Sequence, residues 1–467
     1  MLGFGEQGWL FEECYATVGD LSETLAILFA SPEKKPHFCK PVLAHWAAQH
    51  AALSTIDAEE IPGRILSHLL QLSKDEAFLF LKLSTGGFRV GVSKGLVHEA
   101  IARATHIDRA VIEERMMGVF NAEPDWLEKL KTPATEEELD ARPVPFLLAQ
   151  TLSAEEITKI DPSDVIIEYK WDGIRAQLIK THQITRLWSR GDQDITEQFP
   201  EIIAAAQKLP AQLILDGEIL AGSHEAIGSF NDLQTRLNRK RITKKLLQTN
   251  PAFFRAYDLI RRDGVDYRDS TLMERKEAIA DIQVSQSPFM EPTTISSIQT
   301  MREAARAQSA EGVMIKRRFG LYQSGRKANV WWKWKLDPMT ADCVLIYAQA
   351  GHGRRAALHT DYTLACWNDE GNLVPVAKAY TGLTDQELKQ VDKWIRAHTI
   401  NKFGPVRQVQ PLQVFELGFE GIARSTRHKS GIALRFPRIL RWRTDVGPMD
   451  ADQVSHFHAL MDQAYDV

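Results

Sequence analysis

The feature that most constrains the fold is a change of residue pattern near position 140. Before it, apolar residues recur at helical spacing, as Leu21, Leu25 and Leu28 do. After it, short runs of β-type residues alternate with helical pieces, which is typical of an α+β or mixed domain. Between the two, the stretch KTPATEEELDARPVP at 131–145 is rich in Pro, Thr and Glu and poor in apolar residues. It predicts a linker.

The length of 467 residues exceeds what one ordinary core accommodates, so several domains are expected. We predict a helical domain at 1–135 and an α+β domain at 144–338. From 339 to 467, closely spaced short strands predict a small barrel. One helix interrupts it, beginning at a capping box formed by Thr384 and Glu387.

Composition excludes several classes of protein. No apolar run approaches the roughly 20 residues that cross a bilayer, and the N-terminus lacks the pattern of a secretory signal. The four cysteines are scattered and form no CxxC pair, so we expect no zinc ribbon and a cytoplasmic setting. The net charge of −4 neither suggests nor excludes a nucleic-acid partner, because the distribution of charge matters more than its sum.

A lysine lies inside the β-type stretch EYKWDGIRAQ, between two carboxylates. Side chains alternate faces along an extended segment, so Glu168, Lys170 and Asp172 should point the same way. Three charges directed at one place require either solvent or a ligand. A lysine amine is a nucleophile only when uncharged, and we expect clustered cations and partial burial to favour that form of Lys170.

A second strand, VWWKWKLD, shows the clearest alternation. Trp332 and Trp334 fall on one side and Lys333 and Lys335 on the other. The apolar side should pack into a core, which directs both ammonium groups at one place. Taken alone, such a strand is equally well explained by charges that face solvent.

Several such stretches together predict a nucleotide site. Glu218 in LILDGEIL and Glu311 in EGVMIK could bind Mg²⁺ through oxygen, and Lys333 and Lys335 could neutralise phosphate. Arg175 and Arg190 could grip a ribose or phosphate. The sequence has no P-loop, no kinase HRD and DFG pair, no HExxH and no GxSxG, so another scheme must hold the nucleotide.

Two basic stretches are candidates for DNA contact. TGGFRVGVSKG joins two predicted helices, and its glycines, Arg89 and Lys94 suit phosphate binding at a helix N-terminus, although a plain helix–helix turn explains it as well. RLNRKRITKK contains Arg236, Arg239 and Lys240, and its simplest explanation is a solvated helix face.

The ordered set KWDGIR, SRGDQD, LDGEI, FRAYDLI, EGVMIK and WWKWK resembles motifs I to V of the covalent nucleotidyltransferases. Within that superfamily the chain resembles three-domain ATP-dependent DNA ligases of bacteria. ALRFPRILRWRTD resembles the family's motif VI, and FNDLQTR is also ligase-like. The resemblance implies a multidomain α and α+β fold: an all-helical DNA-binding domain, an ATP-grasp-like nucleotidyltransferase domain with antiparallel sheets, and a C-terminal OB-fold β-barrel.

The resemblance implies a role for each matching residue. Lys170 would attack the α-phosphate of ATP and keep AMP covalently, Glu168 would read the adenine amino group, and Tyr257 would stack on the ring. Further implied contacts to nucleotide, nick phosphate, metal or pyrophosphate fall on Arg175, Arg190, Glu218, Glu311, Lys333, Lys335, Arg441, Arg443 and Asp445. The cofactors would be ATP and Mg²⁺, with Mn²⁺ as an alternative metal.

Nicked duplex DNA would be the substrate of a monomeric repair, replication or recombination enzyme, with nuclease or helicase partners and no membrane. The rivals are an mRNA-capping-type guanylyltransferase or an RNA ligase, a non-catalytic DNA-binding protein and an ordinary α+β protein with charged strands. The helical N-terminal part and FNDLQTR favour DNA ligase. Labelling of the protein by GTP alone would reverse that choice.

The sequence departs from the family's pattern in two places. Val446 occupies the position after Asp445 where the family usually has lysine, which puts efficient self-adenylation in doubt. The resemblance to the family's helical domain also begins late, which implies a naturally short or a truncated domain with a weaker grip on duplex DNA. Phosphate contacts would then dominate that grip and make it salt-dependent.

Overall fold

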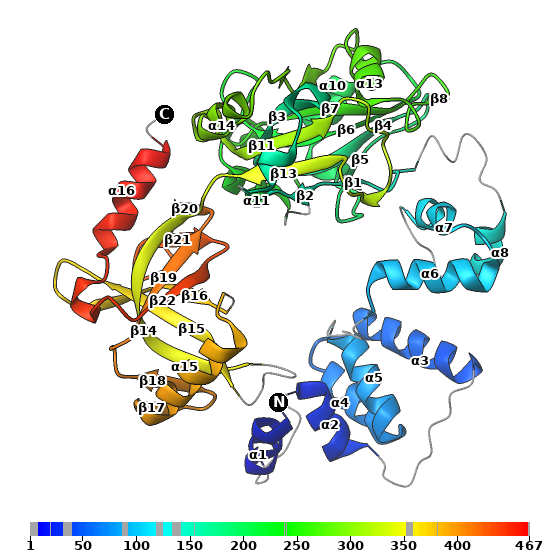
Figure 1. Cartoon of the computed structure of the whole chain (residues 1–467). Helices are drawn as coiled ribbons and strands as arrows, with labels where there is room; N and C mark the ends of the chain where they lie inside the picture. The colour runs from blue at the N-terminus through cyan, green and yellow to red at the C-terminus, as the bar shows by residue number, and fades with distance from the viewer. Residues whose placement is uncertain are drawn as a thin grey trace. The chain divides into compact units, whose positions relative to one another are not determined.

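The structure is a computed structural model, shown in Figure 1. It describes residues 8–18, 20–30, 40–85, 92–117, 125–132, 142–153, 155–237, 239, 241–351, 358–380 and 382–465. The chain divides into two compact units, of which one comprises Met1–Val92 and Pro338–Asp466 and the other Ser93–Asp337. Each unit has buried hydrophobic clusters of its own.

The described elements before residue 92 are helices, as the apolar spacing predicts. They are α1 (Gly8–Val18), α2 (Leu21–Phe29), α3 (Lys40–Ala52), α4 (Ile61–Leu69) and α5 (Lys74–Ser84). A capping box begins α5, since Ser73 accepts from the Glu76 amide and Glu76 accepts from the Ser73 amide. Leu25, Leu69 and Phe80 are buried in the core of these helices.

Three further helices belong to the second unit. They are α6 (Lys94–Thr105), α7 (Arg109–Arg115) and α8 (Trp126–Lys131). α6 begins just after Ser93, whose side chain accepts a hydrogen bond from the Leu96 amide. Arg268 binds Glu114 of α7 at 3.2 Å, which ties this helix to the β-rich part of the same unit.

The β-rich part of the second unit contains two larger sheets and a strand pair. One sheet has the order β10 (Phe289–Met290), β3 (Val165–Trp171), β11 (Ala310–Arg317), β13 (Trp331–Lys335) and β2 (Gln150–Thr151). The other has the order β5 (Thr185–Ser189), β4 (Ile174–Lys180), β6 (Leu213–Ala221), β7 (Ala252–Arg262) and β8 (Val265–Asp266), with β9 (Ser285–Gln286) beside β7. β1 (Leu147–Leu148) pairs with β12 (Gly325–Arg326).

Most strand pairs in these sheets are antiparallel, and the exceptions are β13 with β2, β7 with β9 and β1 with β12. The two large sheets share a hydrophobic cluster in which Trp331 of β13 packs with Tyr257 and Ile260 of β7. Outside them lie α10 (Pro200–Ala206), α11 (Phe230–Leu237), α12 (Lys244–Thr249), α13 (Leu272–Ile279) and α14 (Ile295–Glu303). The nucleotide-site candidates lie on the strands around that shared cluster.

The region after residue 338 is built on a seven-stranded antiparallel sheet. Its strands are β14 (Met339–Ala350), β15 (His359–Trp367), β16 (Leu373–Ala379), β17 (Thr399–Phe403), β18 (Val406–Val409), β19 (Val414–Phe419) and β22 (Arg438–Arg443). β20 (Gly421–Arg424) and β21 (Ile432–Arg435) form a separate pair, and two helices, α15 (Asp385–Ala397) and α16 (Val454–Tyr465), complete the region. The predicted capping box of α15, Thr384 with Glu387, is confirmed.

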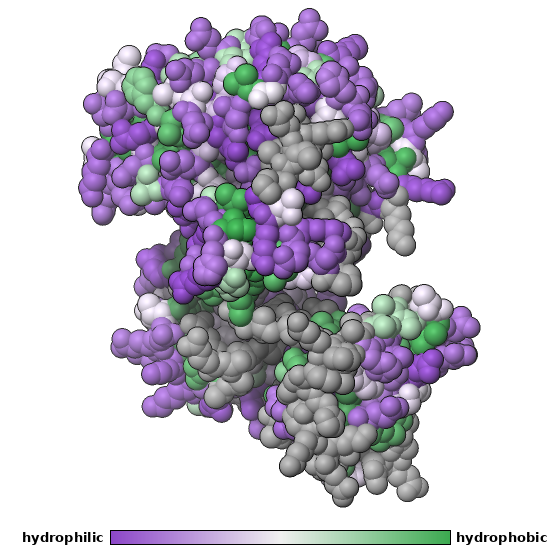
Figure 2. All heavy atoms as spheres, turned by 90° about the vertical axis from the view of Figure 1, so that its right-hand side faces the viewer, coloured by the Kyte–Doolittle hydropathy of each residue, from purple (hydrophilic) through white to green (hydrophobic). Residues whose placement is uncertain are grey.

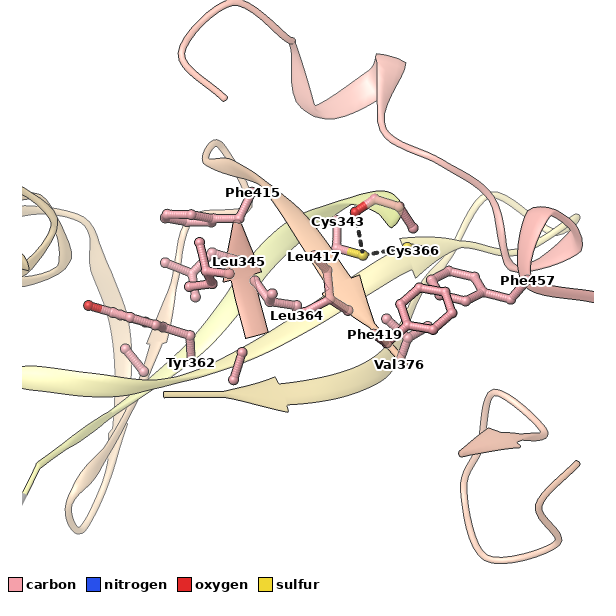
Figure 3. Packing of buried hydrophobic residues seen from close by; sticks show 14 of the residues in the cluster. Cys343, Leu345, Tyr362, Leu364, Cys366, Val376, Phe415, Leu417, Phe419 and Phe457 are labelled. Atoms are coloured by element: carbon pink, nitrogen blue, oxygen red, sulfur yellow. Dashed lines mark hydrogen bonds between the residues drawn. The ribbon is translucent and has the colours of Figure 1, made fainter. Parts of the chain in front are cut away.

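The core of this region is shown in Figure 3, where Phe415, Leu417 and Phe419 of β19 project among side chains of the neighbouring strands. Phe419 stacks on Phe457 of α16 with ring centroids 5.6 Å apart. Cys343 and Cys366, distant in sequence, lie with their sulfurs 3.2 Å apart as thiols. The overall result is a mixed α and β fold with antiparallel sheets, as predicted.

Hydrophilic residues cover most of the described surface on the face in Figure 2, and hydrophobic residues appear as small scattered patches. This distribution matches the placement of the apolar side chains in the interior clusters. Among the described residues, no helix is both long enough and apolar enough to cross a membrane.

Candidate active site

Lys170 lies in an ion-paired cluster built from three adjacent strands. Its Nζ is 2.8 Å from Oε1 of Glu311, and the other oxygen of Glu311 is 2.8 Å from Nζ of Lys335. These residues come from β3, β11 and β13, which are neighbours in the sheet. About a fifth of the Lys170 side-chain surface is exposed, so the side chain is not sealed from solvent.

A β-bulge places Glu311 opposite Lys170. Ala310 pairs with Trp171 and Val313 with Tyr169, so Glu311 and Gly312 together oppose the single residue Lys170. A bulge of this kind re-aims a side chain and is frequent next to active sites. Gly312 has a φ of +142°, and a Cβ there would lie 2.3 Å from the Trp334 carbonyl oxygen. Only glycine fits this position without moving β13.

The second sheet contributes a buried arginine–aspartate pair. Arg175 of β4 donates from Nε and Nη2 to the carboxylate of Asp216 on β6, at 3.1 and 2.7 Å. The Tyr322 hydroxyl donates to the same carboxylate at 2.6 Å. The guanidinium also lies 5.0 to 5.7 Å from the ring centroids of Phe146, Tyr257 and Trp331. Arg175 is therefore held in one orientation beside the aromatic rings.

Tyr257 is the extra residue of another bulge. Asp216 pairs with Asp258 and Gly217 with Ala256, so Tyr257 is skipped in the register between β6 and β7. Its ring packs in the cluster shared by the two sheets, 6.2 Å from the Trp331 ring. The bulge thus presents a flat aromatic side chain beside Arg175.

The two carboxylates proposed to bind metal, Glu218 and Glu311, have pKa values shifted in opposite directions. Burial raises the pKa of Glu218 to about 8, even though Lys170 and Arg175 act in the opposite direction. Burial acts to raise the pKa of Glu311 as well, but Lys170 and Lys335 outweigh it and hold that pKa below its usual value. Glu311 is the stronger candidate for an ionised ligand before nucleotide binds.

Lys333 lies among several cations. Its pKa is lowered by burial and by the charges of Lys335, Lys170, Arg326 and Arg190, in that order. Such a group of like charges is unfavourable by itself and becomes favourable when a phosphate chain neutralises it. The cluster around Lys170 is therefore suited to a polyphosphate.

The carboxylates fit a metal that arrives with a nucleotide. The described residues contain no group of three or more His, Cys, Asp or Glu that could hold a metal ion. Mg²⁺ is commonly held by one or two carboxylates with substrate phosphates as further ligands. Glu218 and Glu311 are close enough for the Glu311 charge to raise the pKa of Glu218, so they could supply that pair.

Comparison with known proteins gives two family-model matches. The ATP dependent DNA ligase domain model matches residues 145–335, and the ATP dependent DNA ligase C terminal region model matches 355–446. A probable DNA ligase of Koribacter versatilis is 33% identical over 94% of this chain and 81% of its own length. The chain belongs to the ATP-dependent DNA ligase family.

Two other similarities extend across nearly the whole chain. A DNA ligase of Methanococcoides burtonii is 27% identical, covering 96% of this chain and 85% of the relative. The solved structure "Pmar-Lig_PreS3" has a TM-score of 0.61 at 16% identity and covers 94% of this chain and 95% of that one. The last comparison supports the fold of this ligase-family chain.

The predicted ligase residues are distributed over both units. Lys170, Glu311 and Lys335 are in direct contact, and Glu218 and Lys333 lie within reach of their charges. The predicted motif VI residues belong to the other unit and form ion pairs there: Arg441 with Glu416 at 3.2 Å, and Arg443 with Asp342 at 2.6 Å and Asp445 at 2.9 Å. Val446 packs beside a small apolar cluster of that unit.

The predictions for DNA contact need one correction. Arg236 is fully buried, and its guanidinium binds Glu201 and the carbonyl oxygens of Gln198 and Asn250. It has no surface to offer a phosphate, so the prediction that it contacts DNA is wrong. Arg239 is exposed as expected.

The other predicted DNA contacts divide into two groups. Lys94 is exposed at the start of α6 and forms an ion pair with Asp192 at 2.6 Å. Arg89 and Lys240 lie outside the described residues.

The corrected role of Arg236 gives a stability prediction. Arg236→Ala should lower the free energy of unfolding by about 3 kcal/mol, because it removes the cation that pairs with Glu201 and the donor to the Gln198 and Asn250 carbonyl oxygens. Arg239→Ala should change it by less than about 0.5 kcal/mol, since that side chain is exposed. Urea unfolding of both variants measures this. Equal stability of the two would return Arg236 to the set of candidate DNA contacts.

Sequence reasoning missed several residues of the ligase site. Arg326 is close enough to Lys333 to lower its pKa. The available signal was the basic pair Arg326–Lys327, which lies two residues before VWWKWK. Lys316, the last residue of EGVMIK, and Lys276 of α13 both bind Glu168. No local pattern indicated that pairing, because α13 lies more than a hundred residues from β3 in sequence.

Proposed function

We propose that this chain is an ATP-dependent DNA ligase that seals 5′-phosphate/3′-hydroxyl nicks in duplex DNA. Lys170 would first take AMP from ATP with release of pyrophosphate. AMP would then pass to the 5′-phosphate of the nick, and the 3′-hydroxyl would displace it to complete the strand. Family membership supports the activity, and the cluster around Lys170 supports the residue roles.

One observation carries the proposal. The strands β3, β11 and β13 bring a lysine nucleophile candidate, a carboxylate and a second lysine into direct contact. Charges from Lys333, Arg190 and Arg326 surround the same place. Clustered cations repel one another, so their concentration here is unfavourable without a ligand. Phosphoryl transfer uses such cations to stabilise the negative charge on phosphate.

The first step would use these residues as follows. The uncharged Lys170 amine forms a bond to the α-phosphorus while the bond from that phosphorus to the bridging oxygen breaks, and pyrophosphate leaves with the electron pair. The nitrogen gives up one proton to water, which leaves a neutral phosphoramide linkage on Lys170. Lys333 and Lys335 stabilise the charge that develops on the phosphate oxygens. Glu218 and Glu311 would hold Mg²⁺, which when bound neutralises phosphate charge. The contact between Lys170 and Glu311 keeps the amine directed into the cluster until nucleotide enters.

The remaining assignments concern the base and the DNA. Glu168 and Tyr257 would bind adenine, and Arg175, fixed by Asp216, would face ribose or the nick. We further propose that the helices before residue 135 bind duplex DNA, with Lys94 and Arg239 among the phosphate contacts. The region after 338 would act as an OB-fold domain whose Arg441, Arg443 and Asp445 orient pyrophosphate.

A nick-sealing gel tests the function. The full chain is incubated with a 5′-labelled nicked duplex, Mg²⁺ and ATP, and in parallel with GTP or with EDTA. We expect a sealed strand with ATP and none with GTP or EDTA, because the pathway begins with adenylate transfer and every step requires neutralisation of phosphate charge. Labelling of the protein by GTP without any nick sealing would favour a guanylyltransferase instead.

A further inference from the structure

Two lysines form ion pairs with the same carboxylate oxygen of Glu168. Nζ of Lys276 lies 2.7 Å and Nζ of Lys316 lies 2.9 Å from its Oε1. The three residues come from β3, α13 and β11, and each is at least nine-tenths buried. Among the described residues, no hydrogen bond reaches Oε2 of Glu168. A buried carboxylate with one oxygen saturated and the other available is a potential acceptor for a ligand.

Aromatic rings hold the lysines as well. Nζ of Lys316 is 4.5 Å from the Tyr257 ring centroid and 4.4 Å from that of Trp331. Nζ of Lys276 is 5.4 Å from the Phe289 ring, and Phe289 is the strand neighbour of Glu168. Both cations therefore have second interactions that fix their positions. Neither lysine is used in the phosphate chemistry proposed for Lys170.

The lysines also determine the protonation state of the carboxylate. Burial acts to raise the pKa of Glu168, but Lys276 and Lys316 outweigh it and hold that pKa below its usual value. Glu168 is therefore an anion at neutral pH and can only accept hydrogen bonds. Without a compensating cation, a carboxylate at this depth would tend to become a neutral acid, which can also donate.

We infer that Lys276, with Lys316, is a positioning residue for base selection: the pair saturates Oε1 of Glu168 and leaves an ionised Oε2 to accept from the 6-amino group of adenine. Guanine carries an oxygen at position 6, and two acceptors facing each other in a buried site repel. The inference rests on the proposed function, because it requires that a purine nucleotide binds here.

Lys276 is the better of the two lysines to change. Lys316 lies against both Tyr257 and Trp331, so its removal would also disturb the aromatic rings. Lys276 comes from a helix outside the sheets, binds Oε1 of Glu168 and lies over the Phe289 ring rather than over Tyr257 or Trp331. Lys276→Met keeps the length of the side chain and removes its charge. Lys276→Arg keeps the charge.

The test compares ATP with purine riboside triphosphate, which lacks the 6-amino group, and with GTP. The readout is the single-turnover rate of enzyme–AMP or analogous adduct formation against nucleotide concentration. A hydrogen bond to a charged group typically gives about a tenfold to hundredfold preference, so wild type should prefer ATP over the purine analogue by that factor. Lys276→Met should lose most of this preference. Its efficiency of adduct formation with ATP should fall at least tenfold, and its efficiency with the purine analogue should change by less than about threefold.

Three controls sharpen the result. Lys276→Arg should restore the preference, and Lys208→Met, at an exposed lysine of the same unit, should behave as wild type. In a chain that already carries Glu168→Gln, Lys276→Met should not reduce the preference for ATP any further, since both substitutions act through the same contact. Lys276→Gln replaces Lys276→Met if urea unfolding shows the latter to be poorly folded.

Each outcome has a defined meaning. Equal losses for ATP and the purine analogue, or no loss for either, would overturn the inference and leave Lys276 with a purely structural role. An additive effect of Lys276→Met on Glu168→Gln would also overturn it. If wild type forms no adduct with any nucleotide, the proposed ligase function fails instead, which is a different result from the loss of discrimination.

Discussion

Lys170→Ala should abolish formation of the enzyme–AMP adduct and nick sealing with ATP, with a loss of about four orders of magnitude or more. The reason is that, in the proposed mechanism, Lys170 supplies the nitrogen that bonds to AMP. Lys333 and Lys335 lie on β13, two strands away from Lys170 on β3, so neither occupies its position. Lys170→Arg should be equally inactive, although it can keep the ion pair with Glu311, because a guanidinium is always protonated.

The same variants should still seal a nick that already carries the 5′-adenylate, within about tenfold of wild type. Lys170 is not the nucleophile in that last step, and the cations that neutralise phosphate remain in place. A labelled, pre-adenylated nick measures this directly. If Lys170→Ala sealed an ordinary nick, Lys170 would not be the nucleophile of the adenylation step. If the variant failed to seal the adenylated nick, the substitution would have damaged more of the site than the nucleophile.

Gly312→Ala should reduce the adenylation rate by at least a hundredfold and destabilise the chain by about 3 kcal/mol. The substitution combines an unfavourable φ of +142° with a Cβ that would lie 2.3 Å from the Trp334 carbonyl oxygen. Relief of that contact requires either loss of the bulge or separation of β11 from β13. Both outcomes move Glu311 away from Lys170 and Lys335, so activity and stability should fall together.

Gly264→Ala is the matched control for Gly312→Ala. Gly264 also has a positive φ, +81°, and belongs to the same unit, but a Cβ there would meet no atom within 4 Å. It should therefore cost about 1 kcal/mol from backbone strain and leave the adenylation rate within about twofold. If both alanine variants behaved alike, the steric account of the bulge at Gly312 would be wrong.

Alternation along single strands was readable from the sequence. Trp332 and Trp334 pack in one cluster while Trp331 packs in another, and Lys335 reaches Glu311, as the pattern of VWWKWKLD predicts. Asp216 and Glu218, two residues apart on one strand, also point the same way, since both interact with Arg175. The capping box at Thr384 was an equally local signal and is confirmed. Each of these patterns depends on residues that are near one another in sequence.

Features that depend on the register between paired strands could not be predicted from the sequence. The bulges at Tyr257 and at Glu311–Gly312 arise from how two distant strands pair, and a single strand gives no sign of them. The prediction that Arg236 in the basic run at 236–245 contacts DNA was wrong for a related reason. The burial of Arg236 depends on Glu201, which belongs to another element. The pairing of Lys276 with Glu168 likewise brings together two residues that no motif connects.

The most direct test of the account is to map the covalent nucleotide. The full chain is incubated with ATP and Mg²⁺, denatured, digested and analysed by mass spectrometry for the peptide that carries AMP. We expect the adduct on Lys170 in the peptide that contains EYKWDGIR, and its release as AMP when nicked DNA is added before denaturation. An adduct on any other side chain, or no adduct with any nucleotide, would contradict the proposed mechanism.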